Sequence, residues 1–385
     1  MKQAVLKIHP KDNVILFDGE SFELPEDIPA KHKFYTSNFS KNAEIIMYGV
    51  LVGKVTQDVK RGGLMTTQNL HHAAEPYSYK GVQFNWTAPN VDKWKHQTFL
   101  GYHRNDGRVG TANYWLFIPT VFCENRNLDV IREAMQNELG YGVTDKYVSF
   151  TRELVSEYKG EACPDRSVGG EREEGKGNTV YGSQLTVNRQ PSTFNRQLTT
   201  QNRIFKNVDG IKFLNHQGGC GGTRQDSEIL QNLLAAYADH PNVGGVTILS
   251  LGCQHLQSND FIAAIKKRNP SFDKPLLLFE QQGGMSEEEL IKHAIASTFN
   301  GLVEINKQER KPATLDKLTV GVKCGGSDGF SGISANPAVG YFSDLLVALN
   351  GKILLAEFPE LCGAEQELID RSTNQATAEK FIHLM

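Results

Sequence analysis

Residues 243–282 read VGGVTILSLGCQHLQSNDFIAAIKKRNPSFDKPLLLFEQQ, and their order of apolar and polar segments indicates the fold class. The apolar run VGGVTILSLGC is followed by the amphipathic segment NDFIAAIKKRN and then by a second apolar run, KPLLLFEQQ. Short apolar runs are typical of buried strands, and the period of the segment between them is typical of a helix. A strand, a helix and another strand in this order predict a parallel sheet covered by helices.

The same alternation continues on both sides of this stretch. Upstream, the sequence predicts a buried strand over residues 114–123 and an amphipathic helix over 127–139. Downstream, it predicts strands that begin at Lys317 and Lys352, with helices over 286–299, 336–351 and 363–372. We therefore expect an α/β domain with a parallel sheet over residues 99–385.

The N-terminal region has a different pattern. Residues 1–75 contain short β-branched runs broken by Asp, Gly and Pro, which predicts a small, mostly β domain. Residues 76–98 are aperiodic and read as a linker. Residues 159–201 are polar and rich in glycine, so we expect a flexible insertion within the α/β domain.

Composition excludes several classes of protein. The chain has 385 residues and a formal net charge of -3, which gives no reason to expect nucleic acid or an anionic membrane as a partner. No apolar run reaches the roughly 20 residues that span a bilayer, and no signal-peptide pattern is present. We expect a cytoplasmic protein. Its six cysteines include no C-x-x-C pair, so zinc ribbons, thioredoxin-like motifs and disulfides are not expected.

The stretch HQGGCGGTRQD, residues 216–226, follows a short predicted strand and combines a histidine, a cysteine and four glycines. Glycine lets the backbone pass close to a ligand or turn with positive φ. Other predicted strands also end in polar residues, in the segments GCQ, EQQ, CGGSDG and EFPE. Ligands of open α/β sheets bind beyond the carboxyl ends of the strands, so these loops predict a pocket.

The same loops contain groups that bind metals. Cys220, Cys253 and Cys324 lie at predicted strand ends, and His216 lies four residues before Cys220. Each cysteine alone can equally be a small buried residue. Mixed nitrogen, sulfur and oxygen ligands suit iron, zinc or manganese.

Two further interpretations concern the binding of anionic ligands, first a carboxylate and then a nucleotide. Arg104 and Arg108 could bind a substrate carboxylate as a fork, or could form surface ion pairs. The glycine loops match neither G-x-G-x-x-G nor the P-loop, so a nucleotide-dependent kinase or synthetase is disfavoured.

Several long motifs resemble one known family. GYHRNDGRVGTANYWLFIPTVFC, HQGGCGGTRQD, GVKCGGSDGFSGISANPAVG and EFPELCGAE are similar to the altronate/galactarate dehydratase family, nearest to its altronate branch. Residues 1–75 resemble the SAF, or β-clip, domain of that family. The chain departs from the family pattern at Thr66-Thr67-Gln68-Asn69, where His-x-His-Asn is usual, and at Gln254, where Glu is usual. The family also continues beyond the point that corresponds to Met385, so we expect its C-terminal segment to be absent here.

The resemblance implies dehydration of D-altronate to 2-dehydro-3-deoxy-D-gluconate, assisted by Fe²⁺ or Mn²⁺. Galactarate is the alternative substrate, and a catalytically inactive paralogue that binds a sugar acid is the alternative function. A homo-oligomer fits this reading as well. We assign catalytic roles to Glu357, Glu360 and Asp328, substrate binding to Arg104, Arg108, Gly325, Gly326 and Ser327, and metal binding to His216, Cys220, Cys253 and Glu365.

Overall fold

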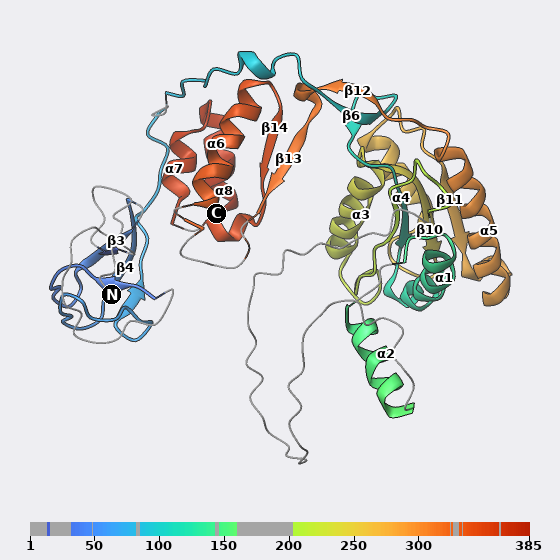
Figure 1. Cartoon of the computed structure of the whole chain (residues 1–385), viewed down its shortest axis with the longest axis horizontal. Coiled ribbons are helices and arrows are strands. Elements are labelled where there is room, and N and C mark those ends of the chain that lie inside the picture. The colour runs from blue at the N-terminus through green and yellow to red at the C-terminus, as the bar shows by residue number, and fades with distance from the viewer. Residues whose placement is uncertain are drawn as a thin grey trace. The chain divides into compact units, whose positions relative to one another are not determined.

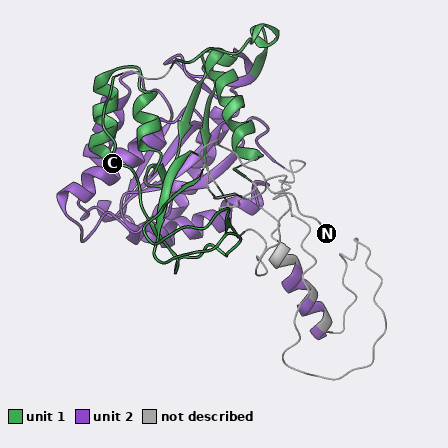
Figure 2. Cartoon of the chain, turned by 90° about the vertical axis from the view of Figure 1, so that its left-hand side faces the viewer, with its two compact units in different colours: residues 1–99, 314–385 green, residues 100–313 purple. Residues whose placement is uncertain are grey.

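A computed structural model describes residues 14–15, 32–47, 49–81, 85–142, 146–159, 203–323, 325, 331–332, 334–361 and 363–385. The chain forms two compact units (Figures 1 and 2): residues 1–99 with 314–385, and residues 100–313. The α/β region expected over 99–385 is therefore divided between them. The predicted insertion, residues 159–201, lies outside the described residues apart from Lys159, the last residue of a helix.

Unit 100–313 is built around a four-stranded parallel sheet in the order β11-β10-β8-β9. Strand β10 pairs in parallel with β8 and β11, and β8 pairs in parallel with β9. All eight residues of β10 are buried, which explains why its sequence is continuously apolar rather than alternating. The strands are β8 (Tyr114–Pro119), β9 (Gly210–Phe213), β10 (Val243–Ser250) and β11 (Leu276–Glu280).

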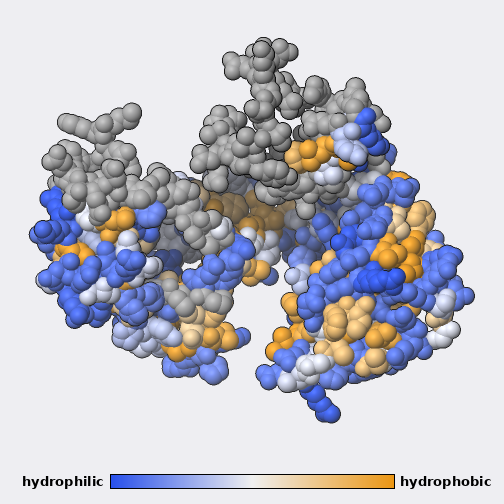
Figure 3. Space-filling view, turned by 90° about the horizontal axis from the view of Figure 1, so that it is seen from below, coloured by the Kyte–Doolittle hydropathy of each residue, from blue (hydrophilic) through white to orange (hydrophobic). Residues whose placement is uncertain are grey.

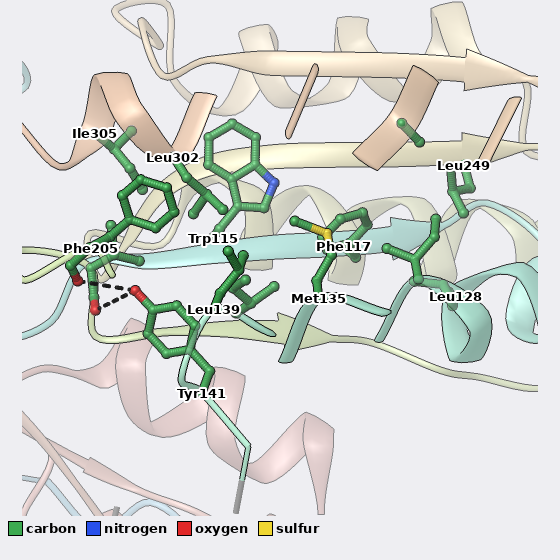
Figure 4. Close-up of a cluster of buried hydrophobic side chains, with 14 of the residues drawn as sticks. Trp115, Phe117, Leu128, Met135, Leu139, Tyr141, Phe205, Leu249, Leu302 and Ile305 are labelled. Atoms are coloured by element: carbon green, nitrogen blue, oxygen red, sulfur yellow. Dashed lines mark hydrogen bonds between the residues drawn. The ribbon is translucent and has the colours of Figure 1, made fainter. Parts of the chain in front are cut away.

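Helices cover both faces of this sheet. Successive side chains of a strand point to opposite faces, so Trp115 and Phe117 enter one core cluster and Leu116 and Ile118 enter another. The first cluster, shown in Figure 4, includes side chains of the two helices on its face. The helices on the Trp115 face are α1 (Asn125–Glu138) and α5 (Glu287–Ile305); those on the other face are α3 (Arg224–Asp239) and α4 (Ser258–Arg268).

Two of these helices begin with reciprocal capping hydrogen bonds. The Thr223 side chain accepts from the Asp226 N–H, and the Asp226 carboxylate accepts from the Thr223 N–H. Ser286 and Glu289 form the same arrangement at the start of α5. Each cap satisfies backbone groups that have no partner within the helix. The last four residues of HQGGCGGTRQD thus end the glycine loop and start α3.

The remaining strands form smaller sheets. The strands expected to continue the main sheet pair instead with each other, as a separate two-stranded parallel sheet of β13 (Thr319–Val322) and β14 (Lys352–Leu355). In the N-terminal region, β3, β4 and β5 form an antiparallel sheet around buried Tyr35, Ile45 and Val55. These observations confirm a mixed α/β chain with an N-terminal β region. The other strands are β1 (Val14–Ile15), β2 (Phe34–Tyr35), β3 (Glu44–Met47), β4 (Val50–Val55), β5 (Leu70–His72), β6 (Thr98–His103), β7 (Val109–Gly110) and β12 (Lys311–Thr314).

The helices outside the main core are α2 (Lys146–Lys159), α6 (Ala335–Ala348), α7 (Glu365–Asp370) and α8 (Gln375–Leu384). No described helix is both long enough and apolar enough to cross a membrane. Figure 3 shows hydrophobic residues scattered among hydrophilic ones on the face in view. Scattered apolar side chains are normal on a folded protein, so we assign no site to them.

Candidate functional site

Three loops meet at the carboxyl edge of the four-stranded sheet. They comprise residues 120–124 after β8, 216–222 after β9 and 251–256 after β10. The Phe122 N–H donates to the Gly218 carbonyl at 3.0 Å, and the His255 N–H donates to the Gly219 carbonyl at 3.2 Å. We call this meeting point the three-loop junction. It lies where the parallel-sheet rule locates a ligand pocket.

Gly219 explains why the middle loop is rich in glycine. Its φ is +98°, and an added Cβ would lie 2.3 Å from the Thr120 carbonyl oxygen. A side chain there would therefore be strained by the backbone conformation and would also collide with the first loop. The glycine at this position therefore permits close backbone packing, which holds the loop directly against the end of β8.

His216 is engaged at both ring nitrogens. Its Nε2 lies 2.8 Å from the Pro119 carbonyl oxygen, and its Nδ1 lies 3.1 Å from the Gly218 nitrogen. A carbonyl accepts and an amide donates, so the ring is the tautomer that carries its proton on Nε2. In this arrangement His216 fastens the loop to β8, and neither ring nitrogen has a lone pair left for a metal.

A polar network follows β10 and β11. Ser250 and Ser258 each lie 3.1 Å, Oγ to Oε2, from the Glu280 carboxylate. The Gln254 side-chain amide donates to Ser250 Oγ at 2.7 Å and to the Leu256 carbonyl at 3.1 Å. Its own oxygen accepts from the Gly252 N–H at 2.7 Å. Gln254 thus both donates and accepts, which a glutamate carboxylate at this position could not do.

A cavity of about 1220 Å³ lies between α3 and α4, and Gln254 belongs to its wall. Arg224 and His255 also line it, so cationic and polar groups face this space close to the three-loop junction. Arg224 is the first residue of α3, where the positive end of the helix dipole also favours an anion. The wall also contains the acids Glu228 and Asp260, so it is polar and of mixed charge and suits a hydroxylated ligand better than an apolar one.

Glu124 is a buried acid that sequence reasoning missed. The residue is 1% exposed, and its Oε2 accepts from the Asn127 side-chain amide at 2.9 Å. Burial raises the pKa of its carboxyl group, and the Asn127 hydrogen bond opposes this rise. The signal was its place directly after the buried strand YWLFIPTVFC, at a strand end like the others.

The cysteine predictions can be examined at two positions. Cys220 and Cys253 are exposed free thiols in two of the three loops. Within the residues that the structure describes, no three His, Cys, Asp or Glu side chains gather closely enough to hold a single metal ion. A one-ion site built from His216, Cys220 and Cys253 therefore does not fit this arrangement.

Arg104 and Arg108 have structural contacts at the opposite, amino edge of the sheet. Arg104 donates to the carbonyl of Pro241, which precedes β10, at 2.8 Å, and to the Asn113 side chain at 3.1 Å. Arg108 forms ion pairs with Asp106 at 2.5 Å and Asp239 at 2.6 Å. Both side chains bind these partners at the amino edge of the sheet, whereas the candidate pocket lies at its carboxyl edge. Neither arginine is therefore part of the candidate site.

The other predicted residues belong to unit 1–99 with 314–385. Glu357 has a positive φ of 61° and forms an ion pair with Lys323 at 2.8 Å. The Glu360 N–H donates to the Glu357 carbonyl at 2.8 Å, which brings these two residues into one turn. Glu365 is buried and accepts from the Gly363 N–H at 2.6 Å. Gly325 is described, whereas Gly326, Ser327 and Asp328 lie outside the described residues.

The N-terminal β region has a cavity of its own, about 540 Å³. Thr66 and Thr67, which stand at the family's histidine segment, line it together with His32 and His72. His32 precedes β2 and His72 ends β5, so both imidazoles reach this cavity from outside the 66–69 segment.

Parallel-sheet α/β units with polar loops at the carboxyl edge of the sheet form a broad class of proteins that bind small molecules at that edge. Comparison with known families narrows this class. The model of the D-galactarate dehydratase/altronate hydrolase second domain matches residues 101–306, more than half of the chain. The C-terminal model of D-galactarate/altronate dehydratases matches residues 315–385, and the altronate/galactarate dehydratase SAF domain matches residues 3–73. The chain belongs to this family, as its motifs indicated.

Individual relatives are similar along the whole chain. The altronate dehydratase of Bacillus subtilis (strain 168) is 27% identical over 100% of this chain and 65% of its own length. The altronate dehydratase of Escherichia coli (strain K12) is 27% identical over 99% of this chain and 65% of its own length. The galactarate dehydratase (L-threo-forming) of Escherichia coli (strain K12) is 24% identical over 99% of this chain and 64% of its own length. The chain thus spans about two thirds of the length of these relatives.

Proposed function

We propose that the chain is a hydro-lyase that dehydrates a sugar acid, with D-altronate as the substrate and 2-dehydro-3-deoxy-D-gluconate as the product. The observation that carries this proposal is the similarity to altronate dehydratases over the whole chain. The polar cavity beside the three-loop junction supports it, because its wall offers hydrogen-bonding side chains to a hydroxylated ligand and includes Arg224, which could bind a carboxylate. Galactarate is the second substrate candidate, since a galactarate dehydratase is also similar.

The reaction has three chemical requirements. The C2 proton of an aldonic acid is only weakly acidic, so a positioned base must remove it. The enediolate that forms carries negative charge that must be stabilised, and the C3 hydroxyl must receive a proton as it leaves. A bound cation such as Fe²⁺ or Mn²⁺ would supply Lewis-acid stabilisation of that charge. Both ring nitrogens of His216 are engaged in hydrogen bonds, so His216 does not fit as a ligand of such a cation.

We propose Glu280 as the general base. Two serine hydroxyls lie within hydrogen-bond distance of its Oε2, which fixes the orientation of the carboxylate. The network links Glu280 to Gln254, which lines the cavity. Arg224 and His255 are our candidates for binding the substrate carboxylate and hydroxyl groups. The catalytic roles predicted from the sequence for Glu357, Glu360 and Asp328 stay predictions.

We propose the cytoplasm as the location, as expected from the sequence. A homo-oligomer stays a prediction.

The experiment is a product assay on the purified chain with a panel of aldonic and aldaric acids, with and without added Fe²⁺ or Mn²⁺. We expect a 2-keto product from altronate, and a Glu280→Gln variant that is at least 10²-fold slower while its unfolding is unchanged. A higher kcat/KM on galactarate would overturn the substrate assignment. Saturable binding of sugar acids without turnover would instead identify an inactive binding protein.

A further inference from the structure

Helix α3 has a line of apolar side chains on its outer face, which we call the α3 stripe. It consists of Ile229, Leu233 and Tyr237, which are 59%, 52% and 46% exposed. Residues four apart are neighbours on one face of a helix, so the three side chains form a continuous line rather than scattered single positions. The outer face of a surface helix is normally polar. The α3 stripe therefore indicates a face that another surface covers.

The α3 stripe points away from the candidate pocket. Ser227 and Gln231 line the cavity between α3 and α4. Ile229 and Leu233 each lie two residues further along the helix, which is a rotation of about 200°. A partner on the α3 stripe would therefore leave the cavity open to its ligand.

The order of residues along the α3 stripe suits contact with a second copy of itself. Leu233 is at the centre, with Ile229 four residues before it and Tyr237 four residues after it. If two copies of α3 pack antiparallel about a two-fold axis at Leu233, each Leu233 meets its equivalent. Ile229 of one copy then meets Tyr237 of the other, and the reverse contact forms as well.

The same symmetry brings Asp226, seven residues before Leu233, to His240, seven residues after it. A seven-residue spacing with apolar positions between is the pattern of helices that pack along a seam. Both end residues are exposed, and His240 directly follows the last helical residue. The two ends of the stripe therefore meet in the antiparallel arrangement.

The groups at these ends are complementary. The Asn242 N–H donates to His240 Nδ1 at 3.1 Å, so the neutral ring carries its proton on Nε2 and can donate it. The N–H and the hydroxyl of Thr223 both donate to Oδ2 of Asp226, at 2.8 Å each, so Oδ1 can accept a further hydrogen bond. Antiparallel packing also places the negative end of each helix dipole beside the positive end of the other.

We propose that the α3 stripe is the contact surface of a homodimer and that its occupant is the α3 stripe of a second copy of this chain. Two-fold contacts of this kind are the commonest in oligomers. One pair of 16-residue helices covers less surface than the roughly 1,600 Å² of a standard interface, so the dimer should dissociate on dilution. The proposal does not rest on the proposed dehydration.

The first test is sedimentation equilibrium of the whole chain over a range of concentrations. We expect the average mass to rise from that of one chain towards that of two. Leu233→Glu places two carboxylates opposite each other at the axis, so this variant should remain monomeric. Its circular dichroism and thermal unfolding should be unchanged because Leu233 is half exposed. Val303→Glu is the matched control, because Val303 is 40% exposed on α5, and it should dimerise normally.

The second test uses cysteine cross-linking under mild oxidation, with the linked peptides identified by mass spectrometry. Leu233→Cys should link to its equivalent in the second copy. Asn232→Cys, one residue along and facing the cavity, should not. A mixture of Ile229→Cys and Tyr237→Cys chains should give the mixed product, as the antiparallel arrangement requires.

Three results would overturn the proposal. Monomers at every concentration would show that a second copy does not cover the α3 stripe. A dimer that persists in Leu233→Glu would have its interface elsewhere. Ile229→Cys linked to its own equivalent would show a parallel arrangement instead. Because neither test uses a sugar acid, failure here leaves the proposed dehydration to its own assay.

Discussion

The α-carbon of Gly219 lies so close to Thr120 that a Cβ atom there would approach the Thr120 carbonyl oxygen to 2.3 Å. The obstacle is backbone rather than a flexible side chain, and the φ of Gly219 is +98°. The loop after β9 is thereby fixed against the end of β8.

Gly219→Ala is expected to destabilise the chain by about 2–4 kcal/mol, because positive φ costs on the order of 1–2 kcal/mol and the collision adds to it. Urea unfolding measures the change. Gly221→Ala is the matched control, since its φ is also positive but nothing lies within 4 Å of its added Cβ. Equal losses from the two variants would show that the contact with Thr120 is unimportant.

Gln254→Glu introduces the residue that the family resemblance leads us to expect, yet it should lower the stability of this chain. Gln254 is 2% exposed and donates to Ser250 and Leu256, which a carboxylate cannot do. We expect a loss of about 2–4 kcal/mol from a buried charge facing acceptors. The measurement is the free energy of unfolding at neutral pH. Unchanged stability would mean that the loop rearranges to accept the acid.

Arg108→Met is expected to act on stability rather than on substrate binding. It leaves the carboxylate of Asp239, which is 6% exposed, without its main partner, at an expected loss of about 2–4 kcal/mol. Once folded, the variant should keep the KM of the unchanged chain. A large rise in KM at full stability would restore Arg108 as a carboxylate-binding residue.

Lys274 predicts a pH dependence of stability. Burial, helped by the positive charge of Arg104, lowers the pKa of its ammonium group to about 7. The unfolded chain, with a lysine pKa of about 10.4, therefore binds more protons than the folded chain between the two values. Stability should accordingly rise with pH across this window and show no further contribution from Lys274 below it. In Lys274→Met that rise should be reduced. Parallel stability curves for the two proteins from pH 7 to 9 would contradict the assignment.

Much of the fold follows from the sequence because its strands are local and strongly apolar. The run VGGVTILS predicts a fully buried strand, and the structure has one at β10. Which strands share a sheet is not a local property, however. The segments at Thr319 and Lys352 have the same alternation as the others, yet they pair with each other in a second sheet.

The candidate site was predictable in position but not in the role of each side chain. The strand-end rule identified the loops of Cys220 and Cys253, whereas the partners of a side chain emerge only from folding. His216 is bound at both nitrogens by backbone groups of β8 and of its own loop, which no spacing in the sequence reveals. For Arg104 and Arg108 the sequence left a carboxylate fork and ion pairs open, and the structure shows Arg108 in ion pairs at the amino edge of the sheet. The burial of Glu124 is likewise a result of tertiary packing and is not encoded in a local pattern.

The most direct test of the central claim is proton NMR of the purified chain with D-altronate in D₂O. Removal of the C2 proton and loss of the C3 hydroxyl give an enol that takes one proton from solvent at C3. We predict 2-dehydro-3-deoxy-D-gluconate with one deuterium at C3 and no C2 proton. Unchanged altronate, with its C2 proton retained after prolonged incubation with and without Fe²⁺ or Mn²⁺, would contradict the account.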